Sequence, residues 1–345
     1  MDRRVDNQKE TRPAGTAERQ TRIFSLGGRS PGVNAPGWMA WTPQAAILWA
    51  LAYGAVQVWW AVGGAPSFGP LGTDLTAFAG WDAVGLCAAA AGVALALMTA
   101  PWRWPLLVAA WGVSAALLVA CARLLLDVVG GLLPGLGVPF HPVAFLSRAA
   151  CLVEGILVGA AAVAYRRRWR SACLFCGRTG MRSRSAWPPR WAGWAAYAAI
   201  AGCLVRLGAQ AAIGFSPLQG GGVSLSLFEI GFVLAGMMLP LALIRPWGQV
   251  FPRRVPLLSG RRVPRWLVLG PAFGIAGGLT VYFGVAIVQF AAETLSGTWE
   301  QRAGSLPLAF FWVAMPAYLV WGLGLGVAAL GYYQVTRPLC RVCGR

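Results

Sequence analysis

Two similar hexapeptides, Cys173-Leu-Phe-Cys176-Gly-Arg178 and Cys340-Arg-Val-Cys343-Gly-Arg345, divide the chain. Each follows a long apolar run that ends in a segment containing tyrosine and arginine. Each hexapeptide therefore stands where the end of one half of a duplicated protein is expected. The pattern predicts two repeats, over 38–178 and 191–345, joined by a linker over 179–190.

The composition indicates an integral membrane protein whose solvent is the lipid bilayer. Of 345 residues, 57% are hydrophobic and 12% are charged, and the mean hydropathy is +0.60. Soluble proteins have about 25% charged residues. The net charge of +18 does not predict a nucleic-acid partner, because that function needs a basic face on a soluble domain and the arginines here lie between apolar spans.

Eight stretches are long enough to cross a bilayer, which takes about 20 apolar residues per helix. They cover 43–63, 83–100, 104–127, 142–164, 191–213, 223–244, 266–292 and 306–333. The predicted fold class is all-α, with eight transmembrane helices.

The arginines set the predicted orientation, because Lys and Arg gather in cytoplasmic loops. They are concentrated before the first span, over 165–190, over 245–265 and after the last span. Both termini and both cysteine pairs are therefore expected on the cytoplasmic side of the plasma membrane. Residues 1–37 are polar and charged without periodicity, which predicts a disordered basic tail, and no signal-peptide pattern precedes the first span.

Further landmarks recur in both halves. They are Trp38-x-x-Trp41 and Trp191-x-x-Trp194 in the first helix, an acid near the start of the second (Asp82 and Glu229), Pro101-Trp102 and Pro246-Trp247 at its end, Arg103-Trp104 and Arg265-Trp266 in the third, and Tyr165 and Tyr332 at equal distances before the cysteines. Four helices per half is an even number. The halves are therefore expected to be parallel repeats related by an axis along the membrane normal.

The paired cysteines predict a metal site. A C-x-x-C-Gly knuckle brings two thiolates to one ion, and the glycine permits the tight turn. Cys173, Cys176, Cys340 and Cys343 are thus expected to bind one structural zinc ion between the halves. A thiol redox pair and unligated thiols remain alternatives. The other four cysteines, Cys87, Cys121, Cys151 and Cys203, are interpreted as small apolar fillers.

Several ionisable residues fall inside or at the ends of apolar spans, where charge is costly. They are Glu154, Arg148, Arg123, Asp127, Arg206, Asp82 and Glu229. Glu154 lies about 18 Å along its span by helical rise, near the bilayer middle. One interpretation is a binding or translocation site, with Glu154 as proton or cation partner and Arg123 or Arg148 as anion partner. The alternative is an ion-pair network that fixes helix register.

The usual catalytic sets are missing from the sequence. His141 is the only histidine, and neither a P-loop, nor H-E-x-x-H, nor a dinucleotide glycine motif is present. The sequence does not predict an enzyme.

The first three helices of each half carry a resemblance to a known group. Tyr53 is followed by Trp59-Trp60-Ala-Val-Gly63-Gly64, then by an acid at the head of the next span and Pro-Trp at its end. This pattern resembles uncharacterised multi-pass membrane proteins of actinobacteria with a duplicated four-helix repeat. The resemblance implies the topology and carries no activity.

Three functions are consistent with these features. The leading hypothesis is passage or export of a small-molecule substrate through a polar pocket between the halves. The second is a membrane-anchored regulator or assembly protein whose zinc clasp binds a cytoplasmic protein partner. The third is a membrane thiol oxidoreductase.

Overall fold

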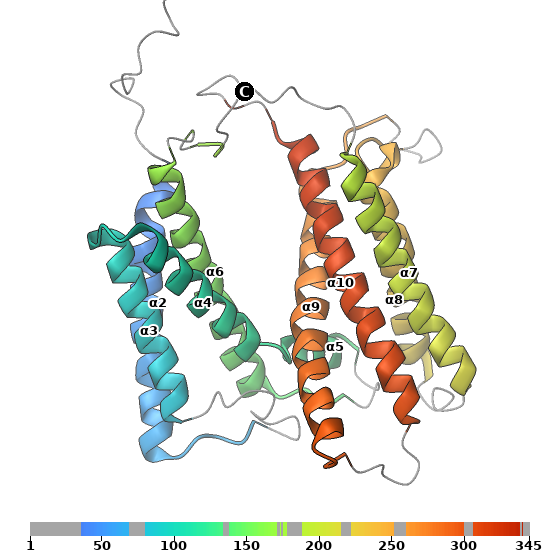
Figure 1. Ribbon diagram of the computed structural model, residues 1–345, viewed down its shortest axis with the longest axis horizontal. Helices are drawn as coiled ribbons and strands as arrows, with labels where there is room; N and C mark the ends of the chain where they lie inside the picture. Colours follow the sequence, from blue (N-terminus) through green and yellow to red (C-terminus); the bar gives the residue numbers. More distant parts are fainter. Residues whose placement is uncertain are drawn as a thin grey trace, which may run out of the picture.

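A computed structural model describes residues 36–68, 80–133, 138–170, 173, 175–177, 188–214, 222–251, 260–299, 306–338 and 340. Within these ranges the fold is helical, and the one β-type pairing is the isolated bridge between Val250 and Arg262. The predicted tail up to residue 35, most of the predicted linker and Cys343 lie outside them. The helices are α2 (Gly37–Gly63), α3 (Trp81–Thr99), α4 (Arg103–Ala120), α5 (Leu124–Leu132), α6 (Pro142–Trp169), α7 (Arg190–Ile213), α8 (Gly222–Ile244), η2 (Pro246–Gly248), α9 (Arg265–Leu295) and α10 (Leu308–Thr336) (Figure 1).

Eight helical segments are long and apolar enough to cross a membrane, as the sequence predicts. Their outward faces carry large exposed apolar side chains, such as Leu48, Trp59, Val108 and Val288. A soluble protein rarely exposes so much contiguous apolar surface. Together these features indicate a multi-pass membrane protein.

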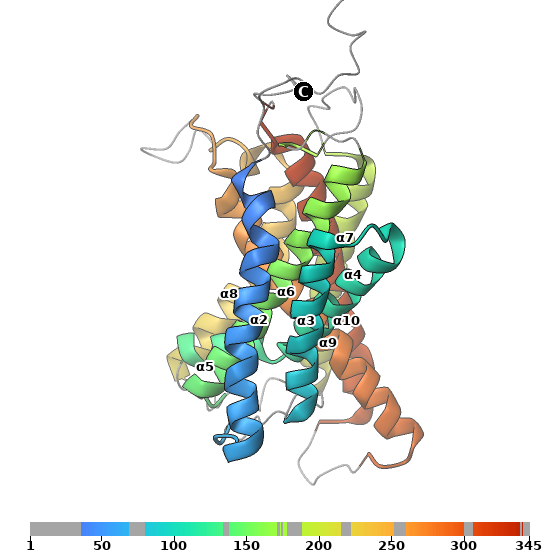
Figure 2. The same cartoon turned by 90° about the vertical axis from the view of Figure 1, so that its left-hand side faces the viewer.

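The third span differs from its prediction as one helix over 104–127. It consists of α4 and α5, separated by a turn at residues 121–123, and α5 is turned out of line with α4 (Figure 2). The break is tight, because the Ala122 N–H donates to the Val119 carbonyl at 3.0 Å, an i to i−3 bond typical of 3₁₀ geometry. Neither proline nor glycine stands at this turn, so the apolar pattern alone does not reveal it.

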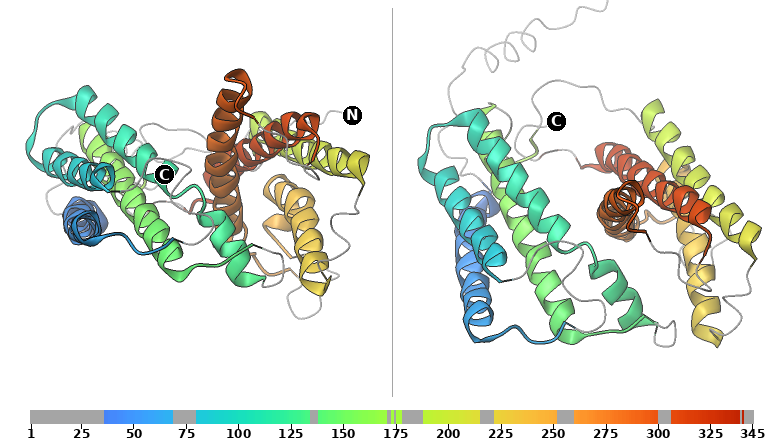
Figure 3. Two further views of the ribbon diagram at one scale, coloured as in Figure 1. Left: turned by 90° about the horizontal axis from the view of Figure 1, so that it is seen from below. Right: turned by 60° about the horizontal axis from the view of Figure 1, so that its bottom comes forward.

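The helices form two groups that correspond to the predicted halves. The first contains α2, α3, α4, α5 and α6, and the second contains α7, α8, α9 and α10 (Figures 1 and 3). Numbering the four long helices of each half in order, the same pairs contact one another: first with second, second with third, third with fourth, first with fourth, and second with fourth. This shared pattern is what a duplicated unit predicts; the symmetry relating the halves stays a prediction.

Two tyrosines make matching contacts in the halves. The Tyr165 hydroxyl donates to the carbonyl of Ala100 at 3.3 Å, and the Tyr332 hydroxyl donates to the carbonyl of Gly248 at 2.7 Å. Both acceptors lie beside a Pro-Trp pair at the end of the second helix. Each tyrosine therefore ties the fourth helix of its half to the backbone beside the Pro-Trp pair that follows the second helix.

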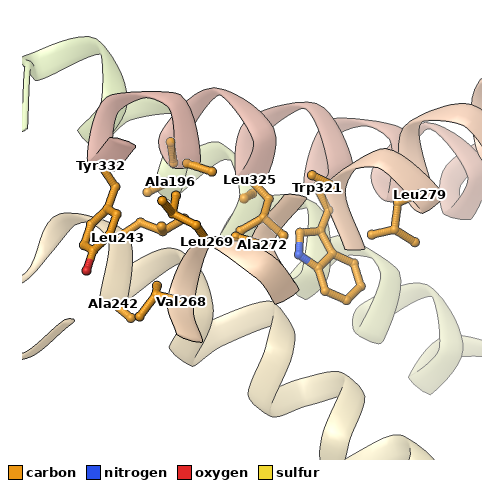
Figure 4. Close-up of a cluster of buried hydrophobic side chains, with 14 of the residues drawn as sticks. Ala196, Ala242, Leu243, Val268, Leu269, Ala272, Leu279, Trp321, Leu325 and Tyr332 are labelled. Atoms are coloured by element: carbon orange, nitrogen blue, oxygen red, sulfur yellow. The ribbon is translucent and has the colours of Figure 1, made fainter. Parts of the chain in front are cut away.

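The core of the second half lies where α10 packs between α7 and α9. Trp321, Leu325 and Tyr332 of α10 meet Leu269 and Leu279 of α9 in one buried cluster (Figure 4). Small residues permit this close packing. A Cβ added to Gly202 of α7, for example, would stand 2.6 Å from the Ala317 carbonyl oxygen of α10.

The first half has a separate core, in which α4 and α6 cross closely. Leu117 of α4 and Val158 of α6 are fully buried there. The hydroxyl of Ser114 donates to the Gly155 carbonyl at 2.8 Å. The crossing is thus held by a buried interhelical hydrogen bond as well as by apolar packing.

The two halves meet mainly through α9, which contacts α4 and α5. Leu125 of α5 packs against Gly278 of α9, where an added Cβ would lie 3.1 Å from the leucine side chain. Gly270 and Gly274, which share the four-residue spacing with Gly278, face open space. Of these three glycines, Gly278 is therefore the one that serves packing within the chain.

Candidate metal centre and buried polar groups

The two cysteine hexapeptides come together at one end of the molecule, although they are far apart in sequence. The Sγ atoms of Cys173, Cys176 and Cys340 all lie within 4.8 Å of one another, and those of Cys173 and Cys340 are 3.9 Å apart. Two thiolates on a tetrahedral zinc ion stand about 3.8 Å apart, given Zn–S bonds of about 2.3 Å. The three thiols are close enough to hold a metal ion.

The first knuckle is shaped by its glycine. Gly177 has φ +73°, a conformation that side chains rarely adopt, and its N–H donates to the Cys173 carbonyl at 2.6 Å. This turn places Cys173 and Cys176 on the same side as Cys340. The 3.9 Å between the Sγ atoms of Cys173 and Cys340 is far longer than a disulfide, which measures about 2.05 Å.

Two arginines stand beside the thiols. The Arg337 guanidinium donates to the Cys176 carbonyl at 3.0 Å and stacks on Tyr333. A Cβ added to Gly177 would stand 2.9 Å from Arg167 Nε, and the Arg167 side chain lies in electrostatic range of Cys173 and Cys176. If a divalent ion were bound, these two cations would offset the negative charge of its thiolate ligands.

Asp127 and Arg148 form a buried ion pair in the first half. Both Asp127 carboxylate oxygens accept from one Arg148 nitrogen, at 2.6 and 2.7 Å. Their side chains are 1% and 9% exposed. Asp127 belongs to α5 and Arg148 to α6, so this salt bridge joins the two helices.

Arg206 is held by a second set of partners, in the other half. Its guanidinium donates to the Tyr318 hydroxyl at 2.8 Å and to the Glu229 carboxylate at 3.3 Å. It also stacks on the Phe232 ring. Arg206 is therefore neutralised and enclosed from several sides.

The remaining ionisable residues have different settings. Asp82 is exposed in the first turn of α3. Glu229 lies in the N-terminal half of α8, which begins at Gly222, and its carboxylate reaches Arg206. Arg123 stands at the break before α5 and interacts electrostatically with Tyr282 of α9.

Glu154 differs from all of these. It is 0% exposed, and neither carboxylate oxygen has a hydrogen-bond partner among the described residues. An ionised carboxylate in that setting is costly. The α6 helix that carries it packs on α2, α3, α4 and α5, so Glu154 lies inside the first half and not between the halves.

A polar cluster that sequence reasoning missed lies near Glu154. Tyr53 and three cysteines, Cys87, Cys121 and Cys151, form one buried group. The Tyr53 hydroxyl lies 2.7 Å from both Gln57 Nε2 and Ser147 Oγ, and 3.7 Å from the Cys151 thiol. Cys87 is in electrostatic range of Glu154.

Matched positions in the second half bear a different chemistry. Counting from Trp38/Trp191, Pro101/Pro246, Arg103/Arg265 and Tyr165/Tyr332 in the four helices, Tyr53, Cys87, Cys121, Cys151 and Glu154 correspond to Arg206, Phe232, Phe283, Tyr318 and Trp321. Phe283 stacks on Tyr318 with ring centroids 4.0 Å apart, and Phe232 meets Trp321 edge to face at 4.6 Å. The second half thus fills these positions with aromatic rings around one paired cation.

One sequence signal could have revealed this correspondence. Gln57 and Gln210 stand at the same distance after Trp38-x-x-Trp41 and Trp191-x-x-Trp194, and both are buried. A position-by-position alignment of the halves from that repeated glutamine leads directly to Tyr53 and Arg206.

Comparisons with known proteins give no family for this chain: no protein-family model, no curated protein and no solved structure matches it.

Proposed function

We propose that this chain is a plasma-membrane protein that passes a small cationic solute, with Glu154 as the carboxylate that binds it. The observation that carries the proposal is the burial of Glu154 without a hydrogen-bond partner among the described residues. Buried ionisable groups in membrane spans commonly mark ion and substrate paths.

A cation is favoured over an anion by the state of the arginines. Arg148 is paired with Asp127, and Arg206 is paired with Glu229. Each would have to leave an acid partner before it could take an anionic solute. Glu154 has no such competitor among the described residues.

We further propose that the metal at Cys173, Cys176 and Cys340 is zinc, with Cys343 as its fourth ligand. A site closed by four thiolates leaves no open coordination position, so its role is structural. Because its ligands come from the ends of both halves, the ion would clasp them together on the cytoplasmic side.

Flux measurements in reconstituted vesicles test the transport proposal. Proton uptake is followed with an enclosed pH dye, and uptake of radiolabelled methylammonium is followed in parallel. The wild type should exceed protein-free vesicles with at least one probe, and Glu154→Gln should abolish that excess. Asp82→Asn is the matched control, because it removes an exposed carboxyl at a helix start, and its flux should stay at the wild-type level.

Two results would contradict the proposal. One is a wild-type protein that moves neither probe above the protein-free rate. The other is a folded Glu154→Gln variant, with the elution profile and melting temperature of the wild type, that retains full flux.

A regulatory or assembly function is the second candidate, supported by the surface around the clasp. Arg166, Arg168 and Arg170 are exposed at the end of α6 that precedes Cys173 in the chain, and the ring of Phe175, between Cys173 and Cys176, is exposed as well. A basic surface with an exposed aromatic ring suits an acidic cytoplasmic protein. If the chain has this function, replacing Arg166 and Arg170 with serine should reproduce in cells the phenotype of deleting the protein. The same variant should leave flux into vesicles at the wild-type level.

A further inference from the structure

The buried cysteines of the first half converge on one place. Cys87 comes from α3, Cys121 from the turn that ends α4, and Cys151 from α6. Outside the hexapeptides the first half has no other cysteine, and all three belong to one buried group. Small apolar fillers would have no reason to gather at a single level of three helices.

A carboxyl joins these thiols. Glu154 is one helical turn beyond Cys151, on the same face of α6, and it interacts with Cys87. The Cys151 thiol in turn is in electrostatic range of Cys87 and Cys121. The group therefore combines soft sulfur donors with an unpartnered oxygen donor, the ligand types that zinc-group ions accept.

From this arrangement we infer that Cys87, Cys121, Cys151 and Glu154 form a second, intramembrane site for a thiophilic divalent cation, Zn²⁺ or Cd²⁺. The inference rests on the proposed function and names its substrate class. It also differs from the clasp, because these ligands lie inside the first half and the clasp ligands lie at the helix ends.

Charge balance favours a divalent ion at this site. Two of the three cysteines bind as thiolates and the third as a neutral thiol, so the bound centre of a 2+ ion carries no net charge into the membrane interior. The two thiolates release two protons when their metal–sulfur bonds form: one passes to the Glu154 carboxylate, which then offers its carbonyl oxygen as a neutral ligand, and the other passes to water. The Tyr53 hydroxyl, fixed by Gln57 and Ser147, can donate a hydrogen bond to the Cys151 thiolate.

Binding requires side-chain movement. Among the described residues, the group whose ligand atoms all lie within 4.8 Å of one another is the clasp, so the buried ligands are more widely spaced in this structure. Cys121 stands at the break between α4 and α5, where the chain can shift with less loss of helical hydrogen bonds. The metal would draw these ligands together.

The second half shows what the same positions become without this function. There the cysteines and the glutamate are replaced by Phe232, Phe283, Tyr318 and Trp321, none of which is a ligand for zinc or cadmium. The remaining buried cysteine, Cys203, lies in that half without a second cysteine in its cluster. It is therefore a matched control for a buried but isolated thiol.

Cadmium binding to the purified full-length protein tests the inference. We expect two Cd²⁺ per chain in the wild type, one at the clasp and one inside the first half. Cys87→Ala/Cys151→Ala should bind one, and Cys203→Ala should bind two. In the wild type, Cd²⁺ should also lower the alkylation of Cys87 and Cys151 by a membrane-permeant maleimide at least 10-fold while leaving Cys203 unchanged, a readout that needs no variant to fold.

The outcomes separate this inference from the proposed function. One Cd²⁺ per chain in the wild type, or two in Cys87→Ala/Cys151→Ala, would overturn the metal site. Unchanged alkylation of Cys87 and Cys151 would also overturn it. If Glu154-dependent flux of protons or methylammonium persists in that case, the proposed function stands and only the substrate class is wrong. Two Cd²⁺ per chain with no Glu154-dependent flux would instead support the site and contradict transport.

Discussion

The two halves share their helix contacts but differ in the chemistry of one set of matched buried positions. In the second half Arg206 is surrounded by Glu229, Tyr318 and Phe232, and its matched positions are closed by aromatic stacking. In the first half Glu154 has no hydrogen-bond partner among the described residues, and the third span is broken. Among the described residues, the first half thus keeps a buried carboxylate without a hydrogen-bond partner, whereas the matched position of the second half holds Trp321, whose indole N–H also lacks a partner but carries no charge.

The largest effect should come from separating the buried ion pair of the first half. Arg148→Met leaves the Asp127 carboxylate buried without its salt-bridge partner, which costs about 3–5 kcal/mol. Unfolding in detergent micelles should show that loss. The double variant Asp127→Leu/Arg148→Met should recover much of it, because two apolar side chains leave no unpaired charge.

The matched comparison is Arg206→Met. The Glu229 side chain is 23% exposed, and its contact with Arg206 is 3.3 Å long. Because Glu229 keeps access to water, the Arg206→Met variant should lose less folding stability than Arg148→Met, about 1.5–3 kcal/mol. A larger loss for Arg206→Met than for Arg148→Met would contradict the comparison between the halves.

A smaller effect is expected where the first and fourth helices cross. In the second half Gly202 packs against the Ala317 carbonyl, whereas at the matched positions Trp49 donates its indole N–H to the Ala150 carbonyl at 3.1 Å. Gly202→Ala should destabilise the protein by about 1–3 kcal/mol through overpacking. Gly85→Ala, which meets open space, should not. Melting temperatures of the two variants test this prediction, which would be wrong if Gly85→Ala lowered the melting temperature as much as Gly202→Ala.

The arginines beside the thiols should tune the metal. Arg337→Ala removes a cation that donates to the Cys176 carbonyl, and loss of such an outer partner weakens metal binding by about 10-fold or more. Competition with a chromogenic chelator measures this change. Arg265→Ala is the control, because it removes an arginine whose stacking partner is Trp266, and it should leave the metal affinity unchanged. An equal loss of affinity in Arg265→Ala would mean that the net charge of the protein, and not the contact of Arg337 with Cys176, sets the affinity.

The smallest difference separates the matched tyrosines. Tyr332→Phe removes a buried hydrogen bond of 2.7 Å and should cost about 1 kcal/mol. Tyr165→Phe removes a longer, part-buried bond of 3.3 Å and should cost less. Chemical unfolding of both variants in micelles tests the order, which would be wrong if Tyr165→Phe were the more damaging.

The sequence predicts the parts of the fold that depend on length and hydrophobicity. The eight spans follow from apolar runs long enough for a bilayer. The meeting of Cys173, Cys176 and Cys340 was expected because both hexapeptides end an even number of helices. Neither inference depends on how any helix is rotated about its own axis.

Features that depend on helix rotation were not predictable in this way. The pairing of Asp127 with Arg148 depends on the turn of α5, and no residue typical of a helix break marks that turn. Predicting that Cys87, Cys121 and Cys151 come together would require knowing which face each of their three helical segments turns inward. Each cysteine alone is indistinguishable from a small apolar residue.

The contact of Leu125 with Gly278 and the group of Cys173, Cys176 and Cys340 are two separate places where the halves come together. A rigid body fastened at two separate points retains a single rotation, about the line through them. If a metal ion joined Cys173, Cys176 and Cys340, rocking of one half on the other would be confined to the line between that ion and the contact of α9 with α4 and α5. Without the ion, the contact at α9 alone would limit the motion.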